Sequence, residues 1–598
     1  MMKLSDYVFD YLKKMSVTTA FTLTGGGIMH LVDSLGRSGM EYVCCHHEQA
    51  AAIAAQAFGM YQEQLSVCLV TTGPGGTNAL TGLAAAYVDS TPVIFLSGQV
   101  KRSDFASLRG VRQFGAQEND IVSMAKPVAK YAVTVQEPDD IAYELEKAVY
   151  LATSGRKGPV WLDIPLDVQA AEIDVETLHH FTIPKDAKLS CQAEVMEKVL
   201  EKLGTSKRPV ILVGQGMVSA GAADLVRDFV KKYHIPVMST WRALDFLDSV
   251  DEDFFGSPGL QAPRYSNLIL QHADCLFVLG SRLDNMITAF DEEHFAFRAQ
   301  KVIVDIDEKE IEKLNMPNVL PVVADIKEFM ECLHSLEERY MQKVQYNVWH
   351  KHCNLIKKRF SIYAEKQNQT GVDLYKVTQC ISECASMNDT IVISSTSRCN
   401  TAGHIAFLHK KGQKTISSMG MGSMGFALPS VVGAYYANAK KRVVMIEGDG
   451  SLQLNIQEFE TIAANGIDAK MFIFDNRGYA AITTMQDRNF AGFYVGSNEK
   501  SGLYMPDTEK IVRAYGLPYL EINSEEEIRD VVNKAFAHQG PIVCNIKGSL
   551  YFDEIPKCIS HIDETTGKRV SAALENPYPF LEKEELNTVT ELLLSKEE

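Results

Sequence analysis

Two polar clusters, each at the end of an apolar run, could together bind a metal ion. The run over residues 443–446 is followed by Asp449, and the run over residues 471–474 is followed by Asn476, with a helical pattern between them. Because the carboxyl ends of parallel strands joined by a helix meet at one edge of a sheet, we expect Asp449 and Asn476 to be neighbours. Their carboxylate and amide oxygens, with a nearby loop carbonyl, would supply part of an octahedral Mg²⁺ shell.

The turn after the first run could also hold phosphate. Gly450 lets the backbone come close to a phosphate group, and Ser451 opens a helix whose N-terminus offers free N–H groups and a favourable dipole. Diphosphate oxygens and water would then complete the metal shell. The stretch therefore predicts a clamp for Mg²⁺ and a diphosphate, and the alternative is an ordinary turn from a strand into a helix.

The order GDGS, helix, strand, DNRGY resembles the motif of thiamine diphosphate enzymes. The resemblance implies that Asp449 and Asn476 are side-chain ligands of Mg²⁺ and that Gly478 gives a backbone carbonyl. The usual Asn-Asn pair of the family is Asp475-Asn476 here, a departure that spares the ligand. The resemblance also assigns to cofactor binding the residues Gly448, Gly450, Ser451 and Tyr479.

A glutamate opens a small-residue helix near the N-terminus. Glu48 could simply interact favourably with the helix dipole. Alternatively, in an apolar environment, its carboxyl group could hydrogen-bond to a nitrogen of a heterocycle. HHEQAAA resembles the glutamate motif of thiamine-dependent decarboxylases and carboligases, in which Glu48 would be catalytic by promoting the imino tautomer of the cofactor. GPGGTN resembles the loop that touches the aminopyrimidine, which assigns Pro74 and Asn78, and the triple-glycine turn adds Gly25 and Gly26.

A methionine turn precedes the clamp. Met424 in GSMG would ordinarily be a core residue. The turn resembles the GxMG turn of the same family, where this apolar residue presses the two cofactor rings into a V shape. The resemblance therefore assigns Gly422 and Met424 to the cofactor site.

The central part of the chain shows weaker evidence of a nucleotide. The lone Gly214-Gln215-Gly216 lacks the full dinucleotide spacing and has no acidic residue at the ribose-reading distance, which disfavours a dehydrogenase. In the resembled family this domain carries FAD, an ADP or nothing. GSRLD around Arg282 and DIDEKE around Asp307 resemble the flavin contacts of acetolactate synthases, and Arg156 is assigned to the same site; the alternative is strand-end turns in an empty domain.

Strands and helices alternate along the chain and predict an α/β protein with three doubly wound parallel-sheet domains. We expect a pyrimidine-binding domain over residues 1–170, a middle domain over 191–336 and a diphosphate-binding domain over 370–550. A polar stretch and a charged helical segment, 337–369, would link them. The last segment, 551–598, has few periodic apolar positions and predicts a surface arm or lid.

Composition indicates an ordinary globular enzyme. Hydrophobic residues make up 46% and charged residues 23%, and the net charge of −17 argues against a nucleic-acid partner. No apolar run is long enough for a membrane span, and the first residues lack a signal-peptide core, so we expect a cytoplasmic protein with no membrane partner. The twelve cysteines have no ligand spacing and are expected to be reduced and mostly buried.

The resemblance implies decarboxylation of a 2-oxo acid, with pyruvate the expected donor, and transfer of the two-carbon unit to a carbonyl acceptor. The resemblance assigns Gln117, Ile482 and Met485 to the substrate region. Biosynthetic acetolactate synthases carry a tryptophan where this chain has Met485. That departure and a polar tail with His561, Lys568 and Arg569 resemble carboligases of bacterial surface-sugar pathways, whose acceptor is a nucleotide-linked keto-sugar. The alternatives are an acetolactate synthase proper, a simple decarboxylase, or a silent cofactor-binding homologue. In the family the active site lies between subunits, which predicts a homodimer or homotetramer.

Overall fold

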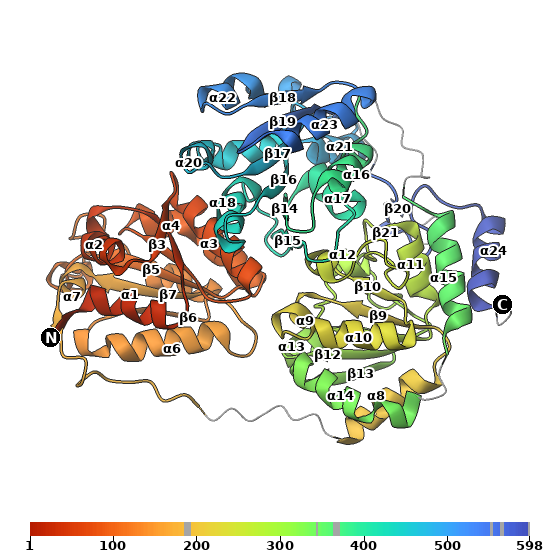
Figure 1. Cartoon of the computed structure of the whole chain (residues 1–598), viewed down its shortest axis with the longest axis horizontal. Coiled ribbons are helices and arrows are strands. Elements are labelled where there is room, and N and C mark those ends of the chain that lie inside the picture. The colour runs from red at the N-terminus through yellow and green to blue at the C-terminus, as the bar shows by residue number, and fades with distance from the viewer. Residues whose placement is uncertain are drawn as a thin grey trace.

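Three parallel sheets with helices on both faces form the protein, as the computed structural model shows (Figure 1). The structure describes residues 1–184, 193–341, 345–362, 371–550, 554–562, 567 and 569–595. The prediction of an α/β fold with three parallel-sheet domains and a C-terminal arm is confirmed. In Figure 1 the N-terminal domain lies at the left, the C-terminal domain at the top and the middle domain at the lower right.

The N-terminal sheet has six parallel strands, with the order β3 (Glu41–Cys44), β2 (Thr19–Leu23), β4 (Ser66–Val70), β5 (Val93–Gln99), β7 (Val160–Pro165) and β6 (Tyr131–Thr134). Its helices are α1 (Leu4–Lys14), α2 (Met29–Ser38), α3 (Glu48–Gln62), α4 (Pro74–Val88), α5 (Ile121–Ala125), α6 (Ile141–Thr153) and α7 (Leu166–Gln169). Two short strands, β1 (Met2–Lys3) and β8 (Glu172–Ile173), pair antiparallel beside it.

The middle sheet has five parallel strands, with the order β10 (Val237–Ser239), β9 (Pro209–Val213), β11 (Cys275–Leu279), β12 (Gln300–Asp305) and β13 (Val319–Val323). Its helices are α8 (Ala193–Thr205), α9 (Gln215–Ser219), α10 (Ala223–Tyr233), α11 (Arg264–His272), α12 (Asn285–Thr288), α13 (Glu308–Glu312), α14 (Ile326–Met341) and α15 (Asn347–Arg359). Helix α15 falls in the stretch expected as a linker. Its side chains Trp349, Cys353 and Ile356 are buried in the middle-domain core, because apolar residues recur at helical spacing on one face.

The C-terminal sheet has six parallel strands, with the order β15 (Lys414–Ile416), β14 (Thr390–Ile393), β16 (Val443–Gly448), β17 (Ala469–Asp475), β19 (Ile542–Lys547) and β18 (Tyr519–Ile522). Its helices are α16 (Leu374–Cys384), α17 (Ser397–Ala406), α18 (Ala427–Ala437), α19 (Asp449–Leu452), α20 (Glu458–Ala464), α21 (Ala480–Phe490), α22 (Thr508–Ala514) and α23 (Ile528–Ala537).

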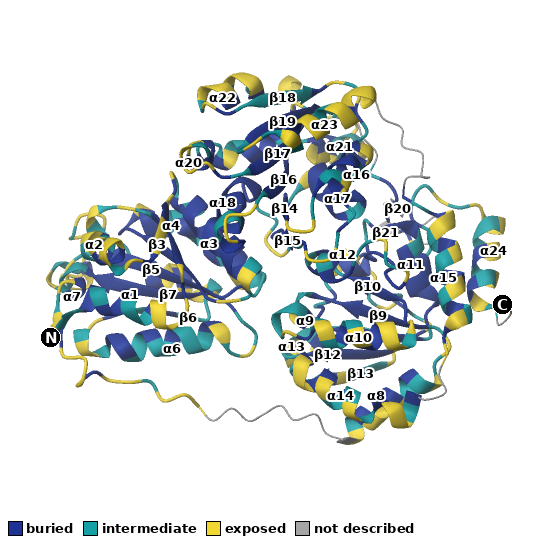
Figure 2. Ribbon diagram, viewed as in Figure 1, coloured by how far each residue is buried: buried dark blue, intermediate teal, exposed yellow. Residues whose placement is uncertain are grey.

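One hydrophobic core is shared by the N- and C-terminal domains. Helices α3 and α18 pack against each other at its centre, and both are rich in small residues that are fully buried (Figure 2). A Cβ atom added at Gly433 of α18 would lie 2.1 Å from the carbonyl oxygen of Ala54 in α3. The absence of a side chain at Gly433 therefore allows the two helices to approach this closely.

The C-terminal arm docks on the middle domain. It contains β20 (Ser560–Ile562), β21 (Arg569–Ser571) and α24 (Lys583–Leu594), and α24 lies beside α15 and α11 in Figure 1. The buried Arg264 of α11 donates hydrogen bonds to the carbonyl oxygens of Pro577 (2.9 Å) and Pro579 (2.6 Å). The arm thus ends in a packed helix, which sequence patterning did not predict. Lys568 and the side chains of His561 and Arg569 lie outside the described residues.

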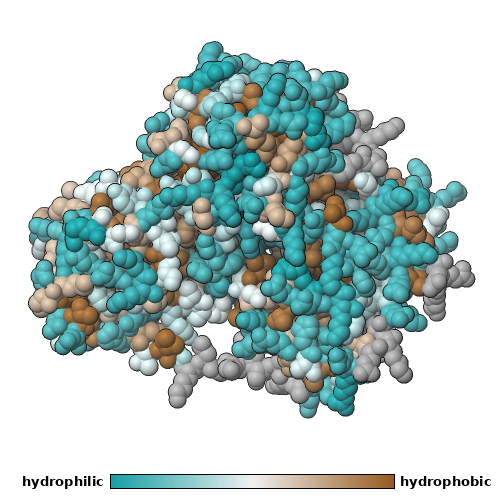
Figure 3. All heavy atoms as spheres, in the orientation of Figure 1, coloured by the Kyte–Doolittle hydropathy of each residue, from teal (hydrophilic) through white to brown (hydrophobic). Residues whose placement is uncertain are grey.

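The hydrophilic surface and the mostly buried, free cysteines are typical of a globular protein. The face shown in Figure 3 is mostly hydrophilic, with apolar residues in separate patches. No helix in the described ranges is both long and apolar enough to cross a membrane. Eight of the eleven described cysteines are buried and all eleven are free thiols, as expected from the sequence.

Candidate active site

Strands β16 and β17 bring the two polar clusters of the predicted clamp to one sheet edge. The strands are parallel neighbours, and Gly448 at the end of β16 is aligned with Phe474 near the end of β17. Asp449 begins α19, and its Oδ2 accepts a hydrogen bond of 2.8 Å from the backbone N–H of Arg477, the residue after Asn476. The structure therefore places Asp449 and Asn476 together, as the strand-end argument expected.

The donor atoms at this edge fit a divalent cation. Asp449 is only 3% exposed, and burial, followed by the neighbouring Asp475 carboxylate, raises its pKa. The Oδ1 atom of Asn476 is buried and has no hydrogen-bond partner among the described residues, which is costly unless another group satisfies it. A Mg²⁺ ion would stabilise the ionised carboxylate and take the amide oxygen as a ligand. The residues present therefore fit the metal, with Gly478 available for its backbone carbonyl.

The aspartate that departs from the family pair has its own counter-charge. Oδ2 of Asp475 accepts hydrogen bonds from Nδ2 of Asn545 (2.9 Å) and from Nζ of Lys547 (2.8 Å). Burial alone would raise the pKa of Asp475, but the Asn545 hydrogen bond and the Lys547 ammonium outweigh it and lower the pKa. Lys547 therefore compensates the extra carboxylate. Sequence reasoning missed Lys547, although an unusual Asp beside a metal ligand is a signal that a cation should lie near.

Glycines in the clamp allow close approach of neighbouring groups. A Cβ atom at Gly450 would lie 2.5 Å from Cε1 of Tyr479, and one at Gly478 would lie 2.7 Å from the carbonyl oxygen of Ser497. Gly448 is the N-cap of α19, in an extended conformation. Side chains at positions 450 and 478 would therefore displace the Tyr479 ring or the backbone around the clamp.

The methionine turn is tied to the clamp. The backbone N–H of Gly425 donates to Oγ of Ser451 (2.8 Å), and Nδ2 of Asn455 donates to the Gly425 carbonyl (2.7 Å). Gly422 and Gly425 have φ values of 63° and 76°, which favour glycine because a Cβ atom is strained there. Met424 lies between these two glycines, in a turn that is held next to α19.

Glu48 lies at the corresponding edge of the N-terminal sheet. It is the first residue of α3, is 7% exposed, and accepts a 3.0 Å hydrogen bond at Oε2 from Nδ2 of Asn78. The His47 side chain caps the helix by accepting from the backbone N–H of Gln49. Pro74 is exposed at the start of α4. The predicted pair Glu48 and Asn78 is thus assembled within one domain.

Tight loops complete this edge. A Cβ atom at Gly25 would meet Oγ1 of Thr71 at 2.5 Å, whereas one at Gly26 would meet no atom within 4 Å. Gln117 is exposed, has a φ of 66°, and lies against Gly73. Gly25 and Gln117 are therefore positioned by the ends of β4 and its loop, and Gly26 is open to a ligand.

A hydrogen bond from His46 to Glu458 joins the Glu48 loop to the C-terminal domain. The backbone N–H of His46 donates to Oε1 of Glu458 in α20 (2.9 Å), and burial raises the pKa of Glu458. The position of Glu458 in an ordinary helical pattern had given no reason to single it out. This bond spans 412 positions of the chain, so only the tertiary fold reveals it.

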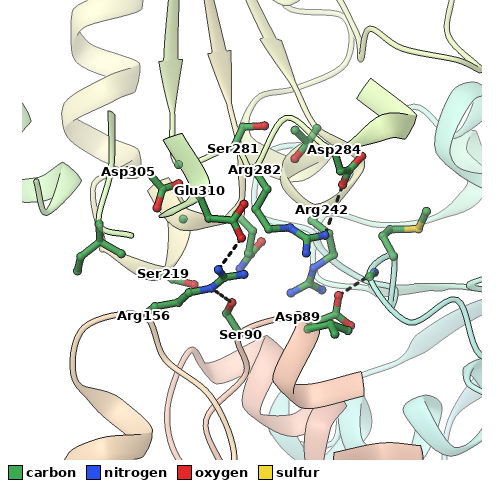
Figure 4. A pocket seen from close by; sticks show the side chains of 18 of the residues that line it. Asp89, Ser90, Arg156, Ser219, Arg242, Ser281, Arg282, Asp284, Asp305 and Glu310 are labelled. Carbon is green, nitrogen blue, oxygen red and sulfur yellow. Dashed lines mark hydrogen bonds and ion pairs between the residues drawn. The ribbon is translucent and has the colours of Figure 1, made fainter. Parts of the chain in front are cut away.

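A separate cavity of about 340 Å³ lies where the three domains meet (Figure 4). Arg156, Arg242 and Arg282 extend their guanidinium groups into it, and Arg242 was not predicted. The Nη1 atom of Arg156 contacts Asp307 (2.9 Å) and Glu310 (2.6 Å), so the structure brings together the three residues assigned to a nucleotide, Arg156, Arg282 and Asp307.

The Gly214-Gln215-Gly216 turn contributes close backbone packing at the end of β9. A Cβ atom at Gly214 would lie 2.3 Å from the carbonyl oxygen of Gly280. The turn therefore lets two strand ends approach and lines one side of the cavity.

The substrate residues proposed on α21 are exposed beside the clamp. Ile482 is 41% and Met485 44% exposed, and the two lie about one turn apart on a helix that begins directly after Tyr479. The helix is held by Arg398, which donates a 2.9 Å hydrogen bond to Thr484. Ile482 and Met485 therefore present an exposed apolar face on the helix that directly follows Tyr479.

Comparisons with known proteins agree with this geometry. Residues 2–124 match the N-terminal TPP binding domain, 196–333 the central domain and 397–546 the C-terminal TPP binding domain of thiamine pyrophosphate enzymes. The chain is 30% identical to acetolactate synthase 1, chloroplastic, of Zea mays, over 91% of this chain and 85% of the relative. It is 30% identical to the acetolactate synthase large subunit of Cyanidium caldarium (90% and 91%) and 29% identical to that of Lactococcus lactis (94% and 96%).

The clamp predicts a metal-dependent loss in one variant. Asp449→Asn removes the buried carboxylate and should weaken Mg²⁺-dependent binding of thiamine diphosphate by at least about 10- to 100-fold, the loss that follows even when only a partner of a metal ligand is removed. Calorimetric titration of the cofactor with and without Mg²⁺ measures this. Asp530→Asn, an exposed carboxylate of the same domain, is the control and should bind normally. Equal affinity in Asp449→Asn and wild type would place the clamp elsewhere.

Proposed function

Because the chain belongs to the thiamine pyrophosphate-dependent enzymes of the acetolactate synthase-like type, we propose that it decarboxylates a 2-oxo acid, with pyruvate as the donor, and transfers the two-carbon unit to a carbonyl acceptor. The acceptor we propose is a nucleotide-linked keto-sugar. The single observation that carries this choice is the exposed aliphatic wall that Ile482 and Met485 form on α21, after the clamp.

The protein's own groups hold and orient the cofactor in this proposal. When bound, thiamine diphosphate supplies the electron sink for decarboxylation. Asp449, Asn476 and the Gly478 carbonyl would hold Mg²⁺, and Gly450 leaves room for the diphosphate. Glu48 would exchange a proton at its carboxylate with a ring nitrogen of the pyrimidine. Its burial against Asn78 keeps that carboxylate out of bulk water and fixes its direction.

The acceptor choice follows from the shape of the wall. An unbranched thioether adapts to different partners, whereas a rigid aromatic ring makes a fixed apolar surface that suits a small 2-oxo acid. With Met485 at the surface of α21, a larger acceptor could lie against the helix. The second candidate is acetolactate synthesis from two pyruvate molecules, and the observation that favours it is the identity of about 30% with acetolactate synthases over most of the chain.

The three arginines of the interdomain cavity support a nucleotide with a diphosphate, and we propose FAD. The volume of about 340 Å³ is at the lower end for sites that bury a ligand, and guanidinium groups pair well with phosphate oxygens. Arg156 is paired with Asp307 (2.9 Å) and Glu310 (2.6 Å). By contrast, Arg282 makes a longer contact of 3.4 Å with Asp284, and Arg242 donates to the Ser417 carbonyl, so Arg242 and Arg282 are the better placed to meet phosphate. Asp305, whose pKa is raised by burial, also lines this cavity.

We also propose that two chains complete the active site. Exposed apolar side chains gather at the end of α21 and in the segment after it, beyond the wall proposed for the acceptor, namely Phe490, Phe493, Val495 and Tyr504. A run of this kind beside a binding site is typical of a surface that another chain covers. A homodimer, or a tetramer built from it, would bury this surface and place Glu48 of one subunit opposite the clamp of its partner.

Mixing two inactive variants tests the shared site. Glu48→Gln should keep cofactor binding and lower turnover by about 10²–10⁴-fold, as expected for loss of acid–base catalysis. Refolding or co-expressing Glu48→Gln with Asp449→Asn should restore about a quarter of wild-type activity, because half of the random dimers have one intact site. Glu137→Gln, an exposed carboxylate, is the control. No recovery on mixing, with heterodimers verified by mass, would show that each site lies within one chain.

Product analysis tests the acceptor. Enzyme, thiamine diphosphate, Mg²⁺ and pyruvate are incubated with and without nucleotide-linked 4-keto-sugars, and the products are identified by mass. We expect a sugar that has gained a two-carbon unit. Met485→Trp should lower kcat/KM for that acceptor at least about 10-fold, since one extra ring fills the proposed space. Met387→Trp, at a distant exposed position, should not. Efficient acetolactate formation with no modified sugar would establish the second candidate instead.

Absorbance and binding test the cavity. Purified protein should carry, or take up, FAD with a visible flavin band that is released on denaturation. Arg282→Ala should weaken FAD binding about 10-fold by removing a charge-assisted hydrogen bond. The exposed Arg339→Ala on α14 is the control. A colourless protein that ignores added FAD but binds ADP would change the ligand, and one that binds neither would leave the cavity empty of nucleotides.

A further inference from the structure

A cluster of metal-ligating side chains lies in the middle domain, among His234, Asp253 and His350. His234 caps the C-terminus of α10, Asp253 lies in the loop that precedes α11, and His350 lies on α15. One ligand atom from each lies within 4.8 Å of the other two. The Nδ1 atom of His234 is 3.3 Å, and the Nε2 atom of His350 3.0 Å, from Oδ1 of Asp253.

The spacing fits a small tetrahedral ion. Ligand atoms bound to Zn²⁺ at about 2.0–2.2 Å in a tetrahedral arrangement lie roughly 3.3–3.6 Å from one another. The two distances to Asp253 are within a few tenths of an ångström of that range. Three protein ligands leave a fourth position for water, and the half-exposed ring of His234 leaves the cluster open to solvent.

The backbone holds the three groups in place. The Asp253 side chain is fully buried, and its carbonyl accepts a 2.8 Å hydrogen bond from Val237, the first residue of β10. Helix α15 is anchored by Nε1 of Trp349, which donates to the Pro209 carbonyl (2.9 Å), and by Nζ of Lys357, which donates to the Phe254 carbonyl (2.7 Å). The ligand atoms are therefore preorganised on three separate segments.

Nε2 of His350 is directed at the Asp253 carboxylate and could share a cation with it. This atom is buried 3.0 Å from Oδ1 of Asp253, so the two groups form an ion pair when the ring is protonated. Burial alone would raise the pKa of Asp253, but the proximity of His350 helps to lower that pKa below its ordinary value. A metal ion bound between the neutral ring and the carboxylate would take the place of that proton. Imidazole nitrogens favour zinc and similar transition metals over Mg²⁺, which prefers oxygen ligands.

Two lysine ammonium groups oppose an ion here: Lys357 donates to the carbonyl oxygens of Asp251 (3.3 Å) and Phe254 (2.7 Å), and Lys231 pairs with Asp253 itself. Nζ of Lys231 lies 3.0 Å from the second oxygen of Asp253 and 2.6 Å from Asp251. It occupies Oδ2 and leaves Oδ1 facing the two histidines. Lys231 should therefore weaken the binding of a cation without blocking it, and its removal gives a variant with the opposite expected effect.

We propose that His234, Asp253 and His350 form a binding site for a divalent transition-metal ion, with Zn²⁺ as the ion, which joins α15 to α10 and to the loop that contains Asp253. The site is separate from the Mg²⁺ clamp in place, ligand type and role. Because the ion would bind His350 of α15 together with ligands on two other segments, it would stabilise the packing of that helix.

Metal titration of the full-length protein tests the site. The protein is prepared without a histidine tag, stripped with chelator, and saturated with Mg²⁺ and thiamine diphosphate so that the clamp is filled. We expect one Zn²⁺ per chain by calorimetry and a higher midpoint of thermal unfolding with Zn²⁺. Bound Co²⁺ should show a spectrum without thiolate bands, which excludes the cysteines. A wild-type protein that binds neither ion overturns the proposal.

Variants locate the ion. His234→Asn, chosen because Asn tolerates the left-handed backbone at φ 49°, and His350→Gln should each weaken Zn²⁺ binding at least about 10-fold. Lys231→Met should tighten it. His334→Gln removes a histidine that lies 3.2 Å from Glu337 in the same domain but outside the cluster, and should bind like wild type. Zn²⁺ binding that is equal in all four variants and the wild type would overturn the site.

Discussion

The active site depends on the close packing of helices that are rich in alanine and glycine. Helix α3 carries Glu48 at its first residue, and α18 follows directly on the methionine turn. A Cβ atom at Gly82 of α4 would lie 2.4 Å from Cβ of Ala52, and Gly433 approaches the backbone of α3 as closely. Because Gly and Ala place at most one methyl group at these contacts, the two cofactor-binding domains can share one core, and larger residues would force them apart.

A second requirement of the active site is that its buried negative charges are balanced. The clamp buries two adjacent carboxylates, Asp449 and Asp475, which is unfavourable without nearby positive charge. Lys547 and Asn545 stabilise the ionised form of Asp475. Asp449 accepts backbone hydrogen bonds from Gly450 and Arg477, but burial and the neighbouring Asp475 carboxylate raise its pKa, so a metal ion there would supply the missing positive charge. One carboxylate of the clamp therefore has a cationic partner within the protein, and the other fits the proposed metal ion.

The middle domain contacts both the N-terminal domain and the C-terminal arm. Its cavity receives Arg156 from the N-terminal domain, and its α11 and α15 receive the C-terminal arm. The arm and α15 bury apolar residues in the same core as the middle sheet, including Trp349, Leu574 and Val589. The arm is therefore an integral part of this domain's packing, and the interdomain cavity and the histidine cluster depend on the same packed elements.

The sequence by itself determined the three parallel sheets and the meeting of Asp449 with Asn476. Local periodicity reveals strands and helices, and parallel strands bring their carboxyl ends to one edge whatever the rest of the fold does. Only the tertiary structure decided that Lys547 pairs with Asp475, that α15 packs on the middle sheet, that the arm ends in a docked helix, and that His234, Asp253 and His350 meet. These contacts join residues far apart in the chain, on segments with no shared periodicity, so their pairing follows from packing alone.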